Sequence, residues 1–390
     1  MTSLTANLPL RVMSLFQGRQ FVLDKALLIS FSCLLATGFV MMSSASMEYA
    51  AQQFGNPWFY VIRQALYIAA MLILMWAATY VPLEFWRKHS AHLLILAFLL
   101  LIAVLVPGIG KEVNGSRRWI DLGPFNLQAS ELAKLFVLTY LAAYLVRREQ
   151  EVRTAWRGFV KPLLVLTAMI ILLLIEPDFG AVVVLLSAAL GMMFLAGVRL
   201  SHFSFVVLGS LAAVTLMVSL SPYRFQRFTT FLDPWSHQFD SGYQLVQSLI
   251  AFGRGEWFGL GLGRSVQKLF YLPEAHTDFV FAIIGEELGF LGAMLVLCLF
   301  AILIWRIFHI ARQAELVGNK FAAYLAYGIA LLFAAQCAIN IGVNVGLLPT
   351  KGLTLPFFSY GGSSLLVCGV MLALVFRVAF ESEGTCQKPS

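Results

Sequence analysis

Three titratable side chains stand close together near the middle of the chain. Glu274, His276 and Asp278 fall within five positions, directly before a long apolar stretch. A carboxylate at the start of a membrane helix can meet both water and a lipid-linked substrate, so Asp278 suits a general base. Capping of the helix by Asp278 is the alternative. Burial would raise the pKa of this carboxyl, whereas the helix N-terminus and nearby arginines would lower it, and the sequence leaves the direction open.

Cations that suit a phosphate group occur in two places. Arg117 and Arg118 lie beside Trp119, and arginine forks match phosphate geometry, although contact with lipid headgroups in general is an alternative. Glu131 and Lys134 open the fourth apolar stretch at a spacing that lets them pair on one helical face. Ionisable residues at membrane depth usually face a cavity or the bundle interior. A salt bridge that only orients two helices is the competing interpretation of this pair.

Two further carboxylates follow Asp278 inside the same apolar stretch. Glu286 lies about 12 Å deeper if the stretch is helical. The azimuths of Glu286 and Glu287 differ from that of Asp278 by roughly 80° and 180°, so we expect that the two do not share a cavity. Arg63, in the second apolar stretch, could pair with Glu286, join the Glu131 pair, or extend toward the lipid headgroups.

The loop at 348–364 is rich in proline and glycine, which preclude a continuous helix. Non-helical backbone at membrane depth is tolerated where it is buried in protein or lines a wet cavity, so we expect this loop to border the site of Asp278. A tight turn is the alternative explanation of Gly361 and Gly362. Residues 176–180 also predict a turn.

The composition identifies the elements that must position these residues. Of 390 residues, 60% are hydrophobic and only 12% are charged, against about 25% in ordinary globular proteins. This excludes a soluble enzyme and a disordered scaffold. The net charge of +7 mostly records membrane topology, and no basic run indicates nucleic-acid binding. No nucleotide-binding G-x-x-x-x-G-K-[ST] motif occurs that would drive an ATP-powered pump.

Hydropathy predicts an all-α, polytopic membrane protein with ten transmembrane helices in a single domain, residues 1–390. The expected spans are 26–45, 58–79, 92–107, 130–146, 162–176, 180–197, 203–221, 279–305, 321–346 and 363–380. Lysine and arginine concentrate in one set of connecting segments, which places both termini in the cytoplasm, with tails at 1–25 and 381–390.

The segment at 222–277, between the seventh and eighth spans, is then a large extracytoplasmic loop. Long loops usually carry function. Leu245, Val246, Leu249 and Ile250 share one helical face, which predicts a helix resting on the outer leaflet. The glycines that follow it indicate a flexible segment more than a nucleotide site.

Four motifs resemble the SEDS family (shape, elongation, division and sporulation proteins), and the likeness extends from Ala26 to Phe380. They are LPEAHTDF at 272–279, GEELG at 285–289, KGLTLP at 351–356 and SYGG at 359–362. The match favours the division type over the elongation type. One departure is Ala129, where relatives often have proline, and it concerns the rigidity of the helix start and not the chemistry.

The resemblance implies a peptidoglycan glycosyltransferase that polymerises lipid II at the division septum, on the outer face of the bacterial inner membrane. Asp278 matches the essential aspartate of the family, which implies that it deprotonates the 4-hydroxyl of the acceptor sugar during an inverting transfer. The implied substrate-binding residues are Arg117, Arg118, Glu131, Lys134, Glu274, His276, Lys351, Ser359, Gly361 and Gly362. Among these, the cations would neutralise the diphosphate, Glu131 would orient Lys134, and Glu274 and His276 would shape the loop.

Neither a cofactor nor a protein metal site is expected, because no convergent set of nitrogen, sulfur or carboxylate ligands occurs. A divalent cation, Mg or Mn, could accompany the diphosphate. The resemblance implies a class B penicillin-binding transpeptidase and other membrane proteins of the division complex as partners, and no nucleic acid. The alternatives are an elongation-type polymerase, a lipid II flippase and a division scaffold without catalysis.

Overall fold

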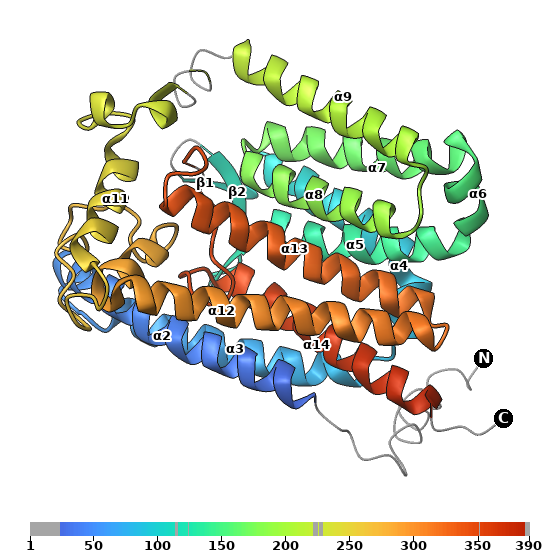
Figure 1. The fold of residues 1–390 in the computed structure, drawn as a ribbon, viewed down its shortest axis with the longest axis horizontal. Helices are drawn as coiled ribbons and strands as arrows, with labels where there is room; N and C mark the ends of the chain where they lie inside the picture. The colour runs from blue at the N-terminus through green and yellow to red at the C-terminus, as the bar shows by residue number, and fades with distance from the viewer. Residues whose placement is uncertain are drawn as a thin grey trace.

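The computed structural model describes residues 24–113, 116–123, 125–220, 225, 229–350 and 352–386. Long helices run side by side in a bundle (Figure 1). The helices are α2 (Lys25–Phe54), α3 (Phe59–Tyr80), α4 (Leu83–Leu105), α5 (Ala129–Arg147), α6 (Glu149–Thr154), α7 (Trp156–Ile175), α8 (Phe179–Leu195), α9 (Leu200–Ser219), α11 (Tyr243–Gly255), α12 (Val280–Leu316), α13 (Lys320–Asn344) and α14 (Gly362–Cys386), with a short 3₁₀ helix at Trp235–His237.

Eight of the helices are long and apolar enough to cross a membrane, so the chain is a polytopic membrane protein. They are α2, α3, α4, α5, α7, α12, α13 and α14. The other two expected spans also coincide with apolar helices, α8 and α9, but the apolar stretches described there are shorter than the other eight.

Several helices extend beyond the predicted spans. The second turn of α4 carries Arg87, Lys88 and His89, so this helix begins at Leu83 and not at 92. Helix α2 continues to Phe54 and α12 to Leu316. Hydropathy finds the apolar part of a helix, and the backbone hydrogen bonds continue through the polar turns at each end.

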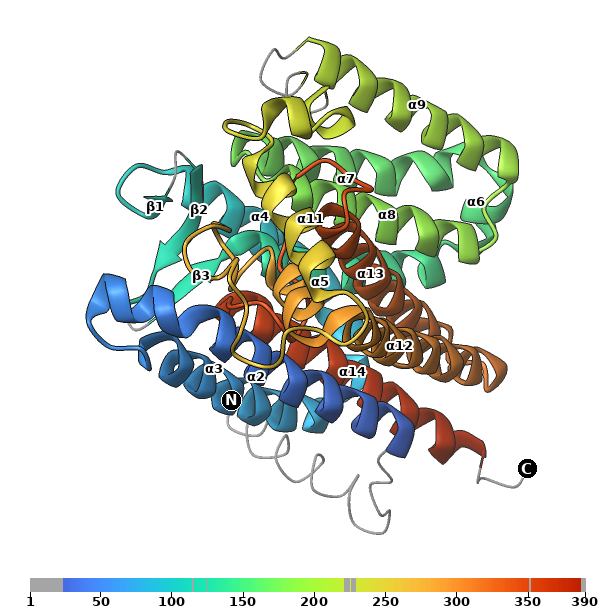
Figure 2. The same ribbon diagram turned by 60° about the vertical axis from the view of Figure 1, so that its left-hand side comes forward.

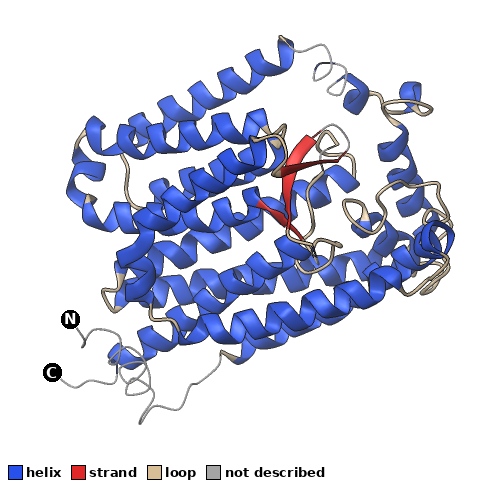
Figure 3. Ribbon diagram, turned by 180° about the vertical axis from the view of Figure 1, so that it is seen from behind, coloured by secondary structure: helices blue, strands red, loops and turns tan. Residues whose placement is uncertain are grey.

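The all-α prediction was wrong in one place, between α4 and α5. Three short antiparallel strands form a sheet in the order β1 (Gly110–Val113), β2 (Ser116–Asp121) and β3 (Asn126–Gln128), shown in red in Figure 3. Ser363, in the first turn of α14, accepts the backbone N–H of Gln128 and donates to the carbonyl of Asn126. This side chain therefore fastens β3 to the start of α14.

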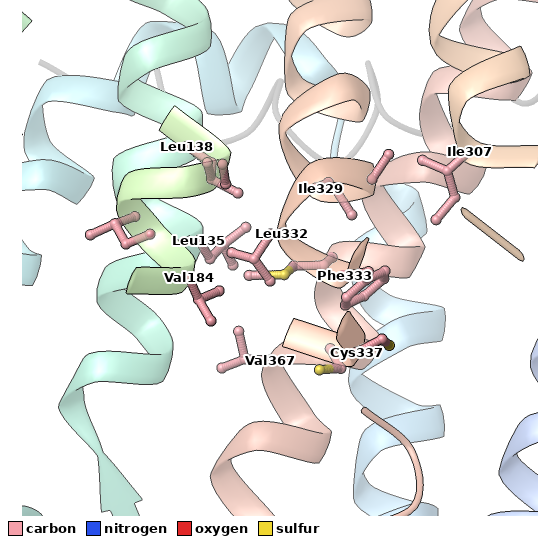
Figure 4. Packing of buried hydrophobic residues seen from close by; sticks show 14 of the residues in the cluster. Leu135, Leu138, Val184, Ile307, Ile329, Leu332, Phe333, Cys337 and Val367 are labelled. Atoms are coloured by element: carbon pink, nitrogen blue, oxygen red, sulfur yellow. The ribbon is translucent and has the colours of Figure 1, made fainter. Parts of the chain in front are cut away.

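The core lies where α5, α8, α13 and α14 meet. Leu135, Leu138, Val184, Leu332 and Phe333 pack together there, all but free of solvent (Figure 4). Helix α3 is the opposite case, because Leu66, Ile73 and Trp76 are exposed and suit contact with lipid. In both Figures 1 and 2, α9 lies at the edge of the bundle, on the side away from α2 and α3.

Helix α11 exists within the long loop as predicted, but part of the apolar face that was expected to meet the outer leaflet packs against protein. Its apolar residues Leu245 and Val246 are buried against protein, mainly α12. A Cβ at Gly255 would lie 1.9 Å from the carbonyl oxygen of Gly285, so only glycine permits this approach. The periodicity revealed the amphipathic face and could not show that the bundle covers part of it.

Candidate active site

Asp278 lies in a tight turn that leads into α12. The carbonyl of Glu274 accepts the backbone N–H groups of Thr277, Asp278 and Phe279. Glu274 itself has a φ of 57°, a left-handed conformation that non-glycine residues rarely adopt. The N-cap of α12 is Phe279, which makes no side-chain cap, so the capping interpretation of Asp278 was wrong.

Asp278 is half-buried, and none of the residues in the described ranges hydrogen-bonds to its carboxyl. Burial by the surrounding protein raises the pKa of this carboxyl to about 7, and the negative charges of Glu274 and Asp178 act in the same direction. The Arg118 guanidinium opposes them. The net shift that the sequence left open is therefore upward, and the group can accept and release a proton near neutral pH.

Arg118 approaches Asp278, whereas Arg117 does not. The two residues are neighbours on β2 at an irregularity of the register, where Glu112 pairs with Arg117 and Lys111 with Trp119, so Arg118 has no partner on β1. Arg118 donates from Nε to the carbonyl of Glu176 at 3.1 Å and from Nη2 to that of Pro177 at 2.6 Å. Arg117 pairs with Glu112 at 3.0 Å and stays 41% exposed. Because Arg118 bonds to carbonyls and not to a carboxylate, its charge is available for an anion.

Residues 176–178 form the predicted turn and also contribute to the site. Asp178 caps α8 by accepting the Ala181 N–H, and it accepts the Ser130 hydroxyl at 2.8 Å. The Glu176 side chain is fully buried, and neither carboxyl oxygen has a partner among the described residues. Burial, with the Asp178 charge, raises the pKa of Glu176 to about 8, while Arg118 lowers it.

Glu131 and Lys134 form the predicted ion pair, with 2.8 Å between Oε2 and Nζ. Lys134 is only 1% exposed, and its ammonium also donates to Gln336 Oε1 at 3.3 Å. Gln336 in turn donates to the carbonyl of Thr354. The pair is thus linked to the loop that precedes α14 and, among the described residues, is not hydrogen-bonded to Asp278.

His276 is enclosed by aromatic rings from three other segments. Its ring centroid lies 4.8 Å from that of Tyr60, 5.3 Å from that of Tyr49 and 6.0 Å from that of Tyr360. Its carbonyl accepts the Tyr360 N–H at 2.9 Å. Burial lowers the pKa of the imidazole, so His276 is neutral at pH 7. These contacts suit the role that the resemblance implied for His276, which is to shape the loop before α12.

The loop before α14 borders Asp278, as predicted. A Cβ at Gly352 would lie 2.9 Å from Asp278 Oδ2. The Ser359 hydroxyl accepts the Leu355 N–H at 2.7 Å and so holds the turn. Gly361 lies beside Thr354, and Gly362 opens α14 against the Tyr67 ring, 2.9 Å from a Cβ built there. Lys351 lies outside the described residues.

Glu286 and Glu287 were expected to face different cavities, but both carboxylates are bound by the same segment. Glu286 pairs with Arg254 at 3.1 Å, Glu287 pairs with Lys268 at 2.8 Å, and Ser265 donates to both. The helical azimuths were correct, but the segment at 256–268 wraps around α12 where Gly289, with φ 69°, interrupts the helix. Glu286 is therefore not the partner of Arg63, which lies 4.4 Å over the ring of Phe59.

Two site residues were missed by sequence reasoning. Asn340 Nδ2 and Asn344 Nδ2 each donate to the carbonyl oxygen of Asp278 at 3.0 Å. With Gln336 they form a series spaced by four residues on one face of the apolar helix α13. That periodic polar face was the available signal. Among the described residues, no group of three His, Cys, Asp or Glu side chains could hold a metal ion.

Comparison with known proteins identifies the family. Residues 25–384 match the model of the FtsW, RodA and SpoVE proteins, described as cell cycle proteins. The chain belongs to the SEDS family. Among SEDS relatives, a protein of Hahella chejuensis is 54% identical over 92% of this chain and 91% of its own. One from Pseudomonas fluorescens is 54% identical over 94% and 90%. Both carry the name "Probable peptidoglycan glycosyltransferase FtsW".

Solved SEDS structures share the fold. A chain from a peptidoglycan synthase complex that coordinates polymerization and crosslinking is 29% identical, with a TM-score of 0.77, over 95% of this chain and 100% of that one. The rod shape determining protein RodA of Thermus thermophilus is 28% identical, with a TM-score of 0.68, over 94% and 99%. The higher identity to the FtsW proteins places this chain with the division type.

Proposed function

We propose that this chain is a peptidoglycan glycosyltransferase that polymerises lipid II, and that Asp278 is its general base. The observation that carries the assignment is the carboxyl of half-buried Asp278, which accepts no hydrogen bond from the described residues and has a pKa raised to about 7. A base with a pKa near the working pH combines a useful ionised fraction with proton affinity.

The proposed step is an inverting transfer. The Asp278 carboxylate accepts the proton of the acceptor sugar's 4-hydroxyl while that oxygen attacks the anomeric carbon of the donor. The bond from this carbon to the pyrophosphate oxygen breaks, and the α linkage becomes β. Because diphosphate is a good leaving group, the step needs charge neutralisation and alignment more than a strong base.

Arg118 is the cation best placed for the leaving diphosphate. Its guanidinium is held by the carbonyls of Glu176 and Pro177, and its positive charge acts on Asp278. Lys351 precedes Gly352, which adjoins Asp278 Oδ2, so we assign it to the same anion. Arg117 is a surface cation that pairs with Glu112. Lys134, buried with Glu131, supports the Thr354 loop through Gln336.

The proposed topology places this site on the extracytoplasmic face of the bacterial inner membrane, at the division septum. In Figure 1 the strands and α11 lie at one end of the bundle, and α6 lies at the other. With ten spans and both termini cytoplasmic, the strand end is outside, and 222–277 is the large outer loop. The whole of residues 1–390 then forms one membrane domain with short cytoplasmic tails.

We further propose a class B penicillin-binding transpeptidase as the partner of this chain within a division complex. The fold match to the chain of a peptidoglycan synthase complex supports this assignment. Coupling of the two proteins would bring new glycan strands directly to the crosslinking enzyme. Lipid II is the substrate in this assignment, and a divalent cation would enter with its diphosphate.

The test is polymerisation of lipid II by the purified chain, reconstituted with its transpeptidase partner. We expect glycan strands from the native chain and none from Asp278→Asn. The matched control is Asp121→Asn, which alters an exposed carboxyl of the β-sheet that pairs with Lys111. Glycan synthesis by Asp278→Asn at the native rate would reject the assignment of the base.

The alternatives make different predictions. A flippase would move labelled lipid II between the leaflets of a liposome without making polymer. A scaffold without catalysis would support division normally with Asp278→Asn. The titratable carboxyl of half-buried Asp278, near a guanidinium that is held by backbone carbonyls and not by a carboxylate, favours the transferase over both.

A further inference from the structure

Three amide side chains on α13 take no part in the proposed chemical step. Gln336, Asn340 and Asn344 are spaced by four residues, so they share one face of the helix. Their exposed fractions are 0%, 1% and 0%. A buried amide in an apolar helix is costly unless its hydrogen bonds are made, so the partners of these groups indicate their role.

Two of the amides meet at the backbone of the proposed base. Asn340 Nδ2 and Asn344 Nδ2 both donate to the carbonyl oxygen of Asp278, each at 3.0 Å. Asp278 precedes the first helical residue, Val280, and lies outside regular secondary structure. These side chains therefore supply the backbone hydrogen bonds that a helix or sheet would otherwise provide.

Asn344 also holds the helix that follows Asp278. Its Oδ1 accepts the N–H of Ala282 at 3.1 Å, in the first turn of α12. The N-cap residue Phe279 offers no side-chain acceptor, so Asn344 caps α12 from a different helix. One amide thus fixes both the carbonyl of Asp278 and the first turn of α12.

The same face of α13 holds the loop opposite Asp278. Asn340 Nδ2 donates to the carbonyl of Leu353 at 2.5 Å, and Gln336 Nε2 donates to that of Thr354 at 2.9 Å. Gly352, the residue before Leu353, is the one that adjoins Asp278 Oδ2. Asn340 therefore sets the separation of the base from the loop that faces it.

A further hydrogen bond connects the end of α13 to the extracytoplasmic loop. Ser248 on α11 donates from Oγ to the carbonyl of Asn344 at 2.7 Å, and Ser248 is fully buried. A movement of α11 would thus reach the last turn of α13, whose amide holds Asp278.

We propose that Asn340 and Asn344 are positioning residues of the transferase, which fix the Asp278 carboxyl relative to the 352–354 loop, and that Ser248 extends this hold to α11. The inference rests on the proposed function, because it assigns Asp278 as the base. Loss of either amide would keep the Asp278 side chain but remove a hydrogen bond that fixes its position. A displacement of about 1 Å can lower a rate roughly 100-fold.

The test uses Asn340→Leu and Asn344→Leu, which keep the branching of the side chain at Cγ and remove the donors. Cys337→Ala, on the same helix and also buried, is the matched control for a packing defect without a lost amide. The readouts are kcat and KM for lipid II polymerisation in the complex with the transpeptidase, the apparent Tm, and the pH profile from 6 to 8.

We expect kcat to fall roughly 10- to 100-fold in both leucine variants, with KM within about threefold of the native value. Among the described residues, the charged groups that act on Asp278 are Glu274, Arg118 and Asp178. Release of the turn admits water to the carboxyl, so the acidic limb of the pH profile should move to lower pH. The limb of Cys337→Ala should stay in place, and a loss of stability alone would not move it.

Two gentler variants cover the case in which a leucine variant does not fold. Asn344→Asp keeps an acceptor for the Ala282 N–H and lacks the amide donor, and Ser248→Ala removes only the link to α11. We expect a lower kcat in each, with the smaller loss in Ser248→Ala. Native kcat and an unmoved pH limb in the folded variants would overturn the proposal. Activity of Asp278→Asn would instead refute the proposed function itself, so the two failures are distinguishable.

Discussion

The pH dependence of polymerisation provides a direct test of the assignment of Asp278. Burial raises the pKa of this carboxyl to about 7, from a usual 3.8. Only the ionised form can accept the hydroxyl proton. At a pKa of about 7, the ionised fraction is about 9% at pH 6 and about 91% at pH 8, so the rate should rise about tenfold between them. An unperturbed carboxyl would change by about 1% over the same interval.

Glu274→Gln tests the origin of this shift. The negative charge of Glu274 is the largest contribution after burial to the raised pKa of Asp278. Its removal lowers the pKa of Asp278, so the acidic limb moves to lower pH and the ratio of the rates at pH 6 and pH 8 approaches one. Removal of the exposed Asp121 carboxyl should leave the limb unchanged, because Asp121 pairs with Lys111 and is not among the charges that act on Asp278.

The assay is initial-rate polymerisation of lipid II in detergent, with each rate normalised to the plateau at high pH so that the position of the limb is separated from the maximal rate. Stability at each pH is checked by recovery of activity after return to pH 8. A rate that is constant from pH 6 to 8, or a limb that moves to higher pH in Glu274→Gln, would refute the electrostatic reasoning.

Three other substitutions have expected outcomes. The folded-state pKa of Glu176, about 8, exceeds the usual 4.5, so its stabilising contribution is complete below about pH 4.5 and is lost as pH rises through 8. Glu176→Gln should therefore raise the apparent Tm more at pH 8 than at pH 5. The corresponding difference in the gain of unfolding free energy is on the order of 3 kcal/mol at most. Lys134→Met leaves Glu131 buried and unpaired, so thermal unfolding should show a loss of about 3–5 kcal/mol, restored in part by adding Glu131→Gln. Gly352→Ala places a methyl group 2.9 Å from Asp278 Oδ2, so kcat should fall roughly 10- to 100-fold while the Tm changes little.

The sequence predicted those parts of the fold that depend on local patterns. All ten expected spans coincide with helices, and the i, i+3 spacing of Glu131 and Lys134 predicted their ion pair. Proline and glycine at 348–364 predicted the non-helical loop that borders Asp278. Each of these depends on the period of a helix or on the conformational limits of single residues.

Features that depend on contacts between distant segments were not predictable in the same way. The partner of Arg118 is the backbone of the 176–177 turn, which any sequence could supply. The three strands are too short for a period to be recognised, and the irregular register at Arg118, which no local pattern announces, accompanies the different partners of Arg117 and Arg118. Local sequence therefore indicated two equivalent arginines, although only one approaches the base.

The amide face of α13 shows how an apolar sequence can still indicate a site. In a lipid-facing helix, Gln336, Asn340 and Asn344 would each expose unsatisfied polar groups to hydrocarbon, at a cost of several kcal/mol per group. A spacing of four residues puts that cost on a single face, so the face must be buried against groups that need hydrogen bonds. Segments without regular structure are where such groups occur, and the turn at Asp278 and the 353–354 loop are two such segments. Periodic amides in a membrane helix therefore locate irregular backbone, and in this chain that backbone carries the proposed base.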